Sequence, residues 1–476
     1  MQIHRVTSVQ NQLSQATRTR GAAHVQELRD LRVVSRAVLL CGVTLLCAGG
    51  MFACLVLVSG HKSTLRDPGS VSSPRNGDEY LARAADCVAC HSIPGGEGFA
   101  GGLKMGTPLG AIYSTNITPD PETGIGRYSL ADFDLAVRHG IAKDGHRLYP
   151  AMPYPSYVKL ADADVAALYR FFMKQVPPVH KANLKSEIPA LLSFRWPLAF
   201  WNFFFAPSAS YVAKPDHDTV WNRGAYLVQG PGHCGACHTP RGIGMQEKAL
   251  DDSSANFLAG AELDAWSAPS LRGDMRTGLG TWSTKDIAEF LEHGHNRVGS
   301  AFGSMTDVIN NSTSYFSDSD IDAIAVYLKS LPATSAQQGV AYDNATTDAL
   351  RNSPTTQPGA AIYGSECASC HGFDAKGFTP YMPALVGNPV VLDLDPSSLI
   401  NLMLNGSIPL VARGTPDAYR MPQFRQQLSD QDIGDVITLI RNGWGNRATA
   451  VTAAQVTKLR KTTDPASDRV VILKMR

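Results

Sequence analysis

Three stretches of the chain carry apolar residues at every third or fourth position, the spacing of one buried helix face. They are LADADVAALYRFFMKQ (160–175), FSDSDIDAIAVYLKSL (316–331) and LSDQDIGDVITLIRN (428–442). Each has Ser or Ala before an Asp, with a second acid two residues later, which is typical of a helix N-cap. We therefore predict three helices, each with one buried face.

The same order of segments precedes each of these helices, so the chain contains three copies of one sequence repeat. A short amphipathic segment opens each unit (76–86, 221–233 and 357–366). After a loop rich in Gly and Pro, a second helical segment follows (128–140, 282–294 and 397–407). No alternating strand pattern competes with these helices. The pattern predicts an all-α fold with long loops.

The repeats divide the chain into six parts. The repeats themselves are predicted to cover 75–180, 216–332 and 353–445. They are preceded by an N-terminal extension (1–36) and a hydrophobic segment (37–60), and they are followed by a basic tail (446–476). Within the tail, VTAAQVTKLRK is predicted to form a basic helix.

The hydrophobic segment contains an uncharged run of 23 residues, 37–59, behind Arg18, Arg20, Arg29, Arg32 and Arg36. At 1.5 Å per residue it can span a bilayer core of about 30 Å. Arginines on its N-terminal side place the extension in the cytoplasm and everything after His61 outside. We predict an inner-membrane protein with its bulk on the periplasmic side. A cleaved signal peptide ending near residues 58–60 remains an alternative, and it exports the same body.

Composition narrows the class of protein. The chain is 44% hydrophobic and 18% charged, which fits globular domains with real cores. Its net charge of +1 gives no overall positive field for binding nucleic acid, so no nucleic-acid partner is predicted.

The cysteines carry the chemistry. Six of the nine form three C-x-x-C pairs, and a histidine follows each pair at once. Two thiols three residues apart on a helical turn can bond both vinyl groups of one haem, and the adjacent histidine then points at the iron. The predicted covalent attachment sites are Cys87, Cys90, Cys234, Cys237, Cys367 and Cys370, with His91, His238 and His371 as proximal iron ligands.

Two other interpretations of a C-x-x-C pair fit this chain less well. A redox dithiol of the thioredoxin type needs a βαβ context, which the pattern lacks. A zinc knuckle needs a second pair or a His pair close by, whereas these pairs lie more than a hundred residues apart. We predict three covalently bound haem c groups in three tandem class I cytochrome c domains behind the N-terminal hydrophobic segment.

The sixth iron ligand must come from elsewhere in each repeat. Met152, Met305 and Met421 each lie between the second helix and the last one, and a His/Met pair suits electron transfer. The rivals are histidines in the first two repeats: His139, His146, His293 and His295. The remaining methionines weighed lie off this position and are interpreted as structural: Met105, Met245, Met275, Met382 and Met403.

Two prolines follow the cysteine pairs of the second and third repeats. We expect Pro269 and Pro383 to present a backbone carbonyl to the proximal histidine's ring N–H, which would orient the ring and tune the iron. The first repeat has Thr-Asn-Ile (115–117) near the same place and lacks the proline.

The segment that joins the first two repeats, LLSFRWPLAFWNFFFAP (191–207), is unusually aromatic. It is interpreted either as a linker packed between domains or as a contact with membrane or partner, where amphipathic aromatic residues are favoured. The sequence does not choose between the two.

The order of elements from about residue 77 to 445 resembles the membrane-bound triple-haem cytochrome c subunit of quinone-linked dehydrogenases. The segments that carry the resemblance are GTPLGAIYSTNITPDPETGIGRYS (106–129), YPAMPYPSY (149–157), RWPLAFWNFFF (195–205) and GPGHCGACHTPRG (230–242). Members of that family serve pyrroloquinoline-quinone (PQQ) alcohol dehydrogenases, and relatives serve flavin gluconate, fructose or aldehyde dehydrogenases. The resemblance implies the His and Met ligands named above. It also implies a periplasmic dehydrogenase large subunit as partner and membrane ubiquinone as electron acceptor.

The leading hypothesis is therefore a three-haem electron-transfer subunit that is not catalytic alone. With both axial positions filled, each iron has no open site for substrate. One alternative is a haem enzyme, peroxidase-like, which requires at least one open or displaceable ligand. Another is a free-standing or oxidase-associated cytochrome c.

Overall fold

The computed structural model describes residues 77–107, 109–263, 265–353, 357–417 and 419–465. All of them belong to one compact unit, Ser63–Arg476. The predicted N-terminal extension and hydrophobic segment lie outside the described residues. Within those residues, the longest apolar helices fall short of the length needed to cross a membrane.

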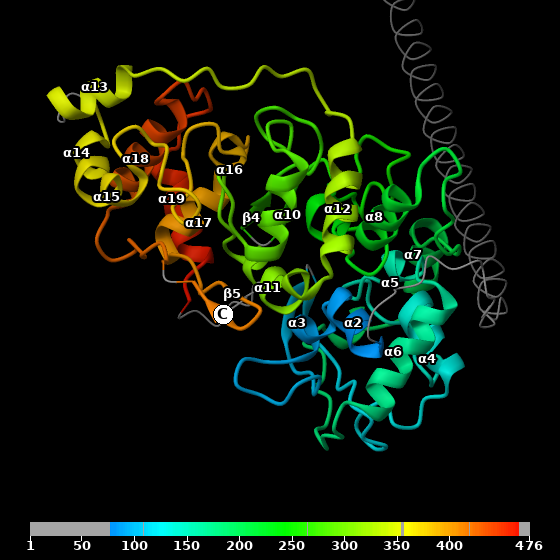
Figure 1. Cartoon of the computed structure of the whole chain (residues 1–476). Coiled ribbons are helices and arrows are strands. Elements are labelled where there is room, and N and C mark those ends of the chain that lie inside the picture. Colours follow the sequence, from blue (N-terminus) through cyan, green and yellow to red (C-terminus); the bar gives the residue numbers. More distant parts are fainter. Residues whose placement is uncertain (1–76, 108, 264, 354–356, 418, 466–476) are drawn as a thin grey trace, which may run out of the picture. The chain divides into compact units, whose positions relative to one another are not determined.

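Helices dominate each repeat (Figure 1). The first contains α2 (Gly77–Ala84), α3 (Cys87–His91), β1 (Lys104–Thr107), β2 (Gly110–Tyr113), α4 (Leu130–His139), α5 (Tyr154–Tyr157) and α6 (Asp162–Lys174). The joining segment forms η1 (Ala190–Leu192) and α7 (Pro197–Phe205). The second repeat contains α8 (Thr219–Gln229), α9 (Gly235–His238), β3 (Ala261–Leu263), β4 (Trp266–Ala268), α10 (Thr284–His293), α11 (Ser304–Asn311), η2 (Thr313–Tyr315) and α12 (Asp318–Ser330).

The third repeat follows α13 (Ala345–Asn352). It contains α14 (Ala360–Ile362), the π-helical turn η3 (Tyr363–Cys367), α15 (Ala368–His371), α16 (Pro389–Leu392), α17 (Ser397–Asn405), β5 (Val411–Ala412), β6 (Thr415–Pro416) and α18 (Asp430–Asn442). Helix α19 (Ala453–Thr462) forms where a basic helix was predicted. Its Val456 and Leu459 are buried in the core of the third repeat, next to the fully buried Trp444.

The predicted helix starts are confirmed where the cap residue is serine. Ser317 and Ser429 accept hydrogen bonds from the backbone N–H groups of Asp320 and Asp432, and Ser429 completes a capping box. The second helices begin in the same way, because Ser129 and Ser283 form capping boxes at α4 and α10. Ala161 has no side-chain oxygen, and α6 starts without a side-chain cap.

The prediction of a purely helical unit missed three short antiparallel strand pairs. Strands β1 and β2 pair Lys104 with Tyr113, β3 and β4 pair Ala261 with Ala268, and β5 and β6 pair Val411 with Pro416. Each strand has two to four residues. Runs this short carry too few positions for an alternating pattern to stand out.

The first two repeats share one hydrophobic core, which includes Leu160, Phe172, Leu227 and Tyr327. Helices α8 and α12 pack closely within it (Figure 1). A Cβ placed on Gly224 of α8 would come within 2.0 Å of the Ala323 carbonyl oxygen of α12, so glycine is what permits this approach. The core thus fixes the first repeat against the second.

Candidate haem sites

The three C-x-x-C-H motifs reach one cavity of about 1310 Å³. They lie at the short helices α3, α9 and α15, with Cys234 just before α9 and Cys367 at the end of η3. Its walls are largely apolar and include Phe172, Trp266 and Phe424. A large apolar cavity with a few fixed polar groups is the usual form of a cofactor site. Every predicted site residue lines it: Cys87, Cys90, His91, Met152, Cys234, Cys237, His238, Met305, Cys367, Cys370, His371 and Met421.

Each proximal histidine is held by a backbone carbonyl. His238 Nδ1 lies 2.8 Å from the Pro269 carbonyl oxygen, and His371 Nδ1 lies 3.0 Å from the Pro383 carbonyl oxygen. Both contacts are those predicted from the sequence. In the first repeat, the Thr115 carbonyl takes this place at 2.7 Å from His91 Nδ1. A carbonyl can only accept, so each Nδ1 donates its proton and Nε2 keeps a lone pair for a metal.

Burial favours the neutral form of these rings. It lowers the pKa of His91, His238 and His371, while the hydrogen bonds to the Thr115, Pro269 and Pro383 carbonyls act in the opposite direction. A neutral imidazole is the form that ligates iron. The donor set therefore fits a haem in each repeat.

The surroundings of the thiols differ from those of a redox dithiol. Burial raises the pKa of Cys87, Cys90, Cys234 and Cys367 to about 12, whereas reactive C-x-x-C thiols have a lowered pKa. Within the described residues, no cluster of three or more His, Cys, Asp or Glu side chains has the arrangement of a metal-ion site.

The methionines are brought to the cavity by different local structures. Met152 precedes α5, and Met305 lies in the first turn of α11. Met421 is in a loop, where its backbone N–H donates to the Ser407 hydroxyl at 2.9 Å. Met105, Met245, Met382 and Met403 also line the cavity, and so does one rival ligand, His146. The cavity alone does not select the ligands, and the choice of Met152, Met305 and Met421 rests on their shared position in the repeats.

Comparison with known proteins assigns the chain to a family. Residues 222–332 match the family described as "Cytochrome c", and residues 354–440 match "Cytochrome C oxidase, cbb3-type, subunit III". The gluconate 2-dehydrogenase cytochrome c subunit of Pantoea cypripedii is 52% identical over 80% of this chain and 88% of the relative. The chain belongs to the family of dehydrogenase cytochrome c subunits. The resemblance inferred from its sequence segments is thereby confirmed.

Other relatives of this cytochrome subunit serve different dehydrogenases. The cytochrome c subunit of the quinone alcohol dehydrogenase of Gluconacetobacter polyoxogenes is 50% identical over 82% of this chain and 84% of its own length. The fructose dehydrogenase cytochrome subunit of Gluconobacter japonicus is 39% identical over 80% of this chain and 81% of its own length. Electron transfer within a dehydrogenase complex is therefore the activity of this family.

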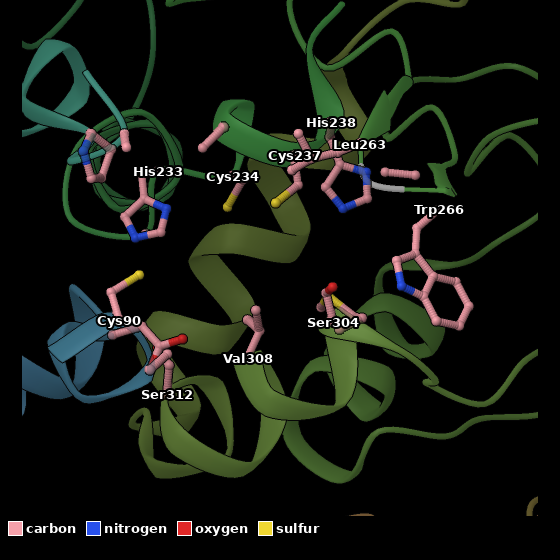
Figure 2. Close-up of a pocket in the computed structure, with 18 of the residues that line it drawn as sticks. Cys90, His233, Cys234, Cys237, His238, Leu263, Trp266, Ser304, Val308 and Ser312 are labelled. Atoms are coloured by element: carbon pink, nitrogen blue, oxygen red, sulfur yellow. The ribbon is translucent and has the colours of Figure 1, made fainter. Parts of the chain in front are cut away.

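In this cytochrome subunit, the sites of the first two repeats meet. Cys90 of α3, Cys237 of α9 and Cys234 just before α9 point into the same part of the cavity, with His233 beside them (Figure 2). Cys237 lies close enough to Cys90 to help raise its pKa. The His233 ring packs 5.6 Å from the Tyr157 ring, and a hydrogen bond to the Ala85 backbone holds it. The attachment points of two predicted haems thus face a common space.

Sequence reasoning missed two acids at this junction, the buried Asp86 and the half-buried Asp307. Asp86 precedes the first cysteine pair and Asp307 lies two residues after Met305, and α3 packs against α11. Burial raises the pKa of Asp307 to about 7, and burial together with the charge of Asp307 raises the pKa of Asp86. A signal was present, because the residue before each cysteine pair is polar: Asp86, His233 and Glu366.

A second missed residue is Glu247, which lies beside the cysteine pair of α9. A Cβ on Gly235 would come within 2.3 Å of its Oε2 atom, and that oxygen has no hydrogen-bond partner within the described residues. Burial raises the pKa of Glu247 to about 7, against the opposing effects of Arg241 and Lys159. Nothing in the spacing of this carboxylate marked it as buried.

Proposed function

We propose that this subunit carries three haem c groups and passes electrons from a periplasmic dehydrogenase subunit to membrane ubiquinone. The single observation that carries the proposal is the continuous cavity, which is lined by all three C-x-x-C-H motifs and by a methionine from each repeat. Three redox sites along one cavity form a path between two partners rather than three isolated centres.

The residues have distinct roles. The six cysteines would attach the haems, and His91, His238 and His371 would ligate the irons through Nε2, each oriented by its carbonyl partner. Met152, Met305 and Met421 would take the opposite axial positions. Iron held between His and Met supplies one-electron transfer at a raised potential. Filled axial positions also leave no place for a peroxide, which disfavours a haem enzyme.

The partners follow from the relatives, one of which is named as a subunit of a quinone alcohol dehydrogenase and another as a subunit of gluconate 2-dehydrogenase. By analogy, we propose that this subunit receives electrons from a large dehydrogenase subunit that holds PQQ or flavin. Its electron acceptor would be ubiquinone. The predicted apolar run at 37–59 would keep it at the inner membrane, with its bulk on the periplasmic side.

The test measures haem content and quinone reduction together. The mature chain, purified with its partner, is expected to contain three haems per chain and to reduce ubiquinone when the partner's substrate is added. Changing both cysteines of one repeat to alanine, for example Cys367→Ala with Cys370→Ala, should leave two haems. The matched control Ser369→Ala, between the same cysteines, should keep three. Fewer than three haems in the unmodified chain, or a high-spin iron that turns over peroxide, would contradict the proposal.

A further inference from the structure

Exposed apolar side chains occur on α7 and on the segment just before it, between the first two repeats. It consists of Leu191, Phe194, Trp196, Phe203 and Phe204, which are 85%, 61%, 55%, 61% and 66% exposed. We call this set the α7 face. These five large apolar side chains come from one short segment, residues 191–204. Proteins surrounded by water rarely expose a large apolar area, and where they do, something else covers it.

The opposite side of α7 is firmly packed, so the exposed side is fixed in place. Trp201 donates a hydrogen bond from Nε1 to the Gly244 carbonyl at 2.7 Å, which ties the helix to the second repeat. Tyr154 donates to Asn202 Oδ1 at 2.6 Å, which ties it to the first. Ile243, the neighbour of Gly244 in the chain, is also fully exposed. The interpretation of the aromatic segment as a linker packed between domains is therefore confirmed for this packed side of α7.

The charge of the region favours lipid over protein as the covering partner. Between residues 189 and 213 the only charged residue is Arg195, and no acidic residue occurs. Arg195 stacks over the Tyr149 ring at 3.8 Å and donates to the Arg147 carbonyl, so it offers a protein partner little hydrogen bonding. Protein interfaces usually surround an apolar centre with a polar rim, whereas Trp and Phe without acids are typical of the membrane interface.

The chain length before the first described helix is compatible with this choice. If the run 37–59 spans the bilayer, residues 60–76 separate it from α2. Seventeen residues extend to at most roughly 60 Å, at about 3.5 Å per residue, so the body stays near the membrane surface.

From these observations, we propose that the α7 face lies on the lipid bilayer, with Trp196, Phe203 and Phe204 in the headgroup region. The proposal rests on the membrane location assigned under the proposed function. It adds which side of the molecule meets the lipid: the side where the joining segment bridges the first and second repeats. Trp201 and Phe205 of the same helix also line the haem cavity, so the bilayer would lie next to the redox path.

A photo-crosslinking experiment on the full-length chain in native membranes tests this. The photoreactive residue benzoylphenylalanine replaces Phe204 in one variant and Leu394, which is 85% exposed in the third repeat, in the control. After illumination, phospholipid adducts are measured by mass spectrometry, and three haems per chain confirm that each variant is folded. At least about tenfold more lipid adduct is expected at position 204 than at 394, because only the α7 face would be immersed in lipid.

Every other result overturns the proposal. An adduct with another polypeptide would mean that a protein partner covers the face, and an adduct with residues 1–76 would mean that the chain covers itself. Equal lipid labelling at both positions, or no labelling, would also refute it. The readout needs no electron transfer. Lipid adducts without ubiquinone reduction would therefore refute the proposed function alone, and ubiquinone reduction without adducts would refute the α7 face alone.

Discussion

At the scale of single residues, all three histidines need a backbone carbonyl to accept the Nδ1 proton, and either a proline or a threonine supplies it. Each needs a carbonyl within hydrogen-bond distance of Nδ1, and the chain supplies it from Pro269 and Pro383 in two repeats and from Thr115 in the other. Proline is therefore not required by the chemistry. What matters is a backbone carbonyl at the correct distance, which any residue can provide.

The axial methionines lead to a prediction with a matched control. Replacing Met152, Met305 or Met421 by leucine should remove the low-spin His/Met spectrum of one haem in each variant and lower the reduction potential of that haem, because the thioether stabilises reduced iron. Visible spectra and a redox titration measure both effects. Met403→Leu, which lines the same cavity off the repeated position, should leave all three spectra unchanged. A Met152 variant that keeps its His/Met spectrum would show that another methionine is the ligand, and a bis-His spectrum already present before the change would point to His146.

Glu247 gives the subunit a predictable pH dependence. Its pKa rises from 4.5 to about 7 on folding, so the folded state holds a proton that the unfolded state loses. The associated stability is present below pH 4.5 and is lost as the pH rises to about 7. At 1.36 kcal/mol per pKa unit, the loss in unfolding free energy is at most about 3 kcal/mol. Glu247→Gln should flatten this decline in thermal unfolding followed by circular dichroism between pH 4.5 and 7. An unchanged slope in the variant would contradict the assignment.

At the scale of elements, the packing of α8 on α12 is fastened by a buried ion pair. Arg223 of α8 donates to both carboxylate oxygens of Asp320 on α12, at 2.7 and 2.8 Å. Tyr80 of α2, in the first repeat, donates to the same carboxylate at 2.5 Å. One aspartate thus joins the first helix of the first repeat to two helices of the second.

Removing that aspartate should loosen both repeats together. Asp320→Ala leaves Arg223 buried without its carboxylate partner, which is expected to cost about 3–5 kcal/mol of unfolding free energy. Denaturant unfolding of the haem-containing subunit measures the loss. Asp322→Asn, on the exposed side of the same helix, is the control and should have little effect. The double variant Arg223→Met with Asp320→Leu should recover most of the stability, and its failure to do so would mean that the ion pair itself is needed.

The helices and strands also show which features of the fold could be predicted from the sequence. Helix starts at Ser317 and Ser429 were predictable because a cap is a local arrangement of a few residues. The short strand pairs and the two-sided packing of α7 were not, since both depend on contacts with distant parts of the chain. The same holds at the site: the C-x-x-C-H motifs are local, whereas the burial of Glu247 and the effect of Cys237 on the pKa of Cys90 arise only when the repeats pack together.

At the scale of the whole molecule, the second repeat lies against both others. It shares a core with the first. It meets the third through Ser267, which donates to Asp393 at 2.8 Å, and through Glu292, which forms an ion pair with Arg413 at 2.8 Å. The second repeat therefore lies between the first and third repeats, and residues of all three line one cavity.

Because the second repeat contacts both other repeats, we predict that its haem is required for electron flow through the subunit. Cys234→Ala with Cys237→Ala should leave two haems per chain and reduce substrate-dependent ubiquinone reduction to background, whichever end of the path receives electrons. The corresponding variants of Cys87 with Cys90, and of Cys367 with Cys370, are matched comparisons. Loss of an end site should abolish activity only if electrons enter or leave there, so these two variants identify the ends. A second-repeat variant that keeps its partner subunit and still reduces ubiquinone would contradict the central role of the second repeat.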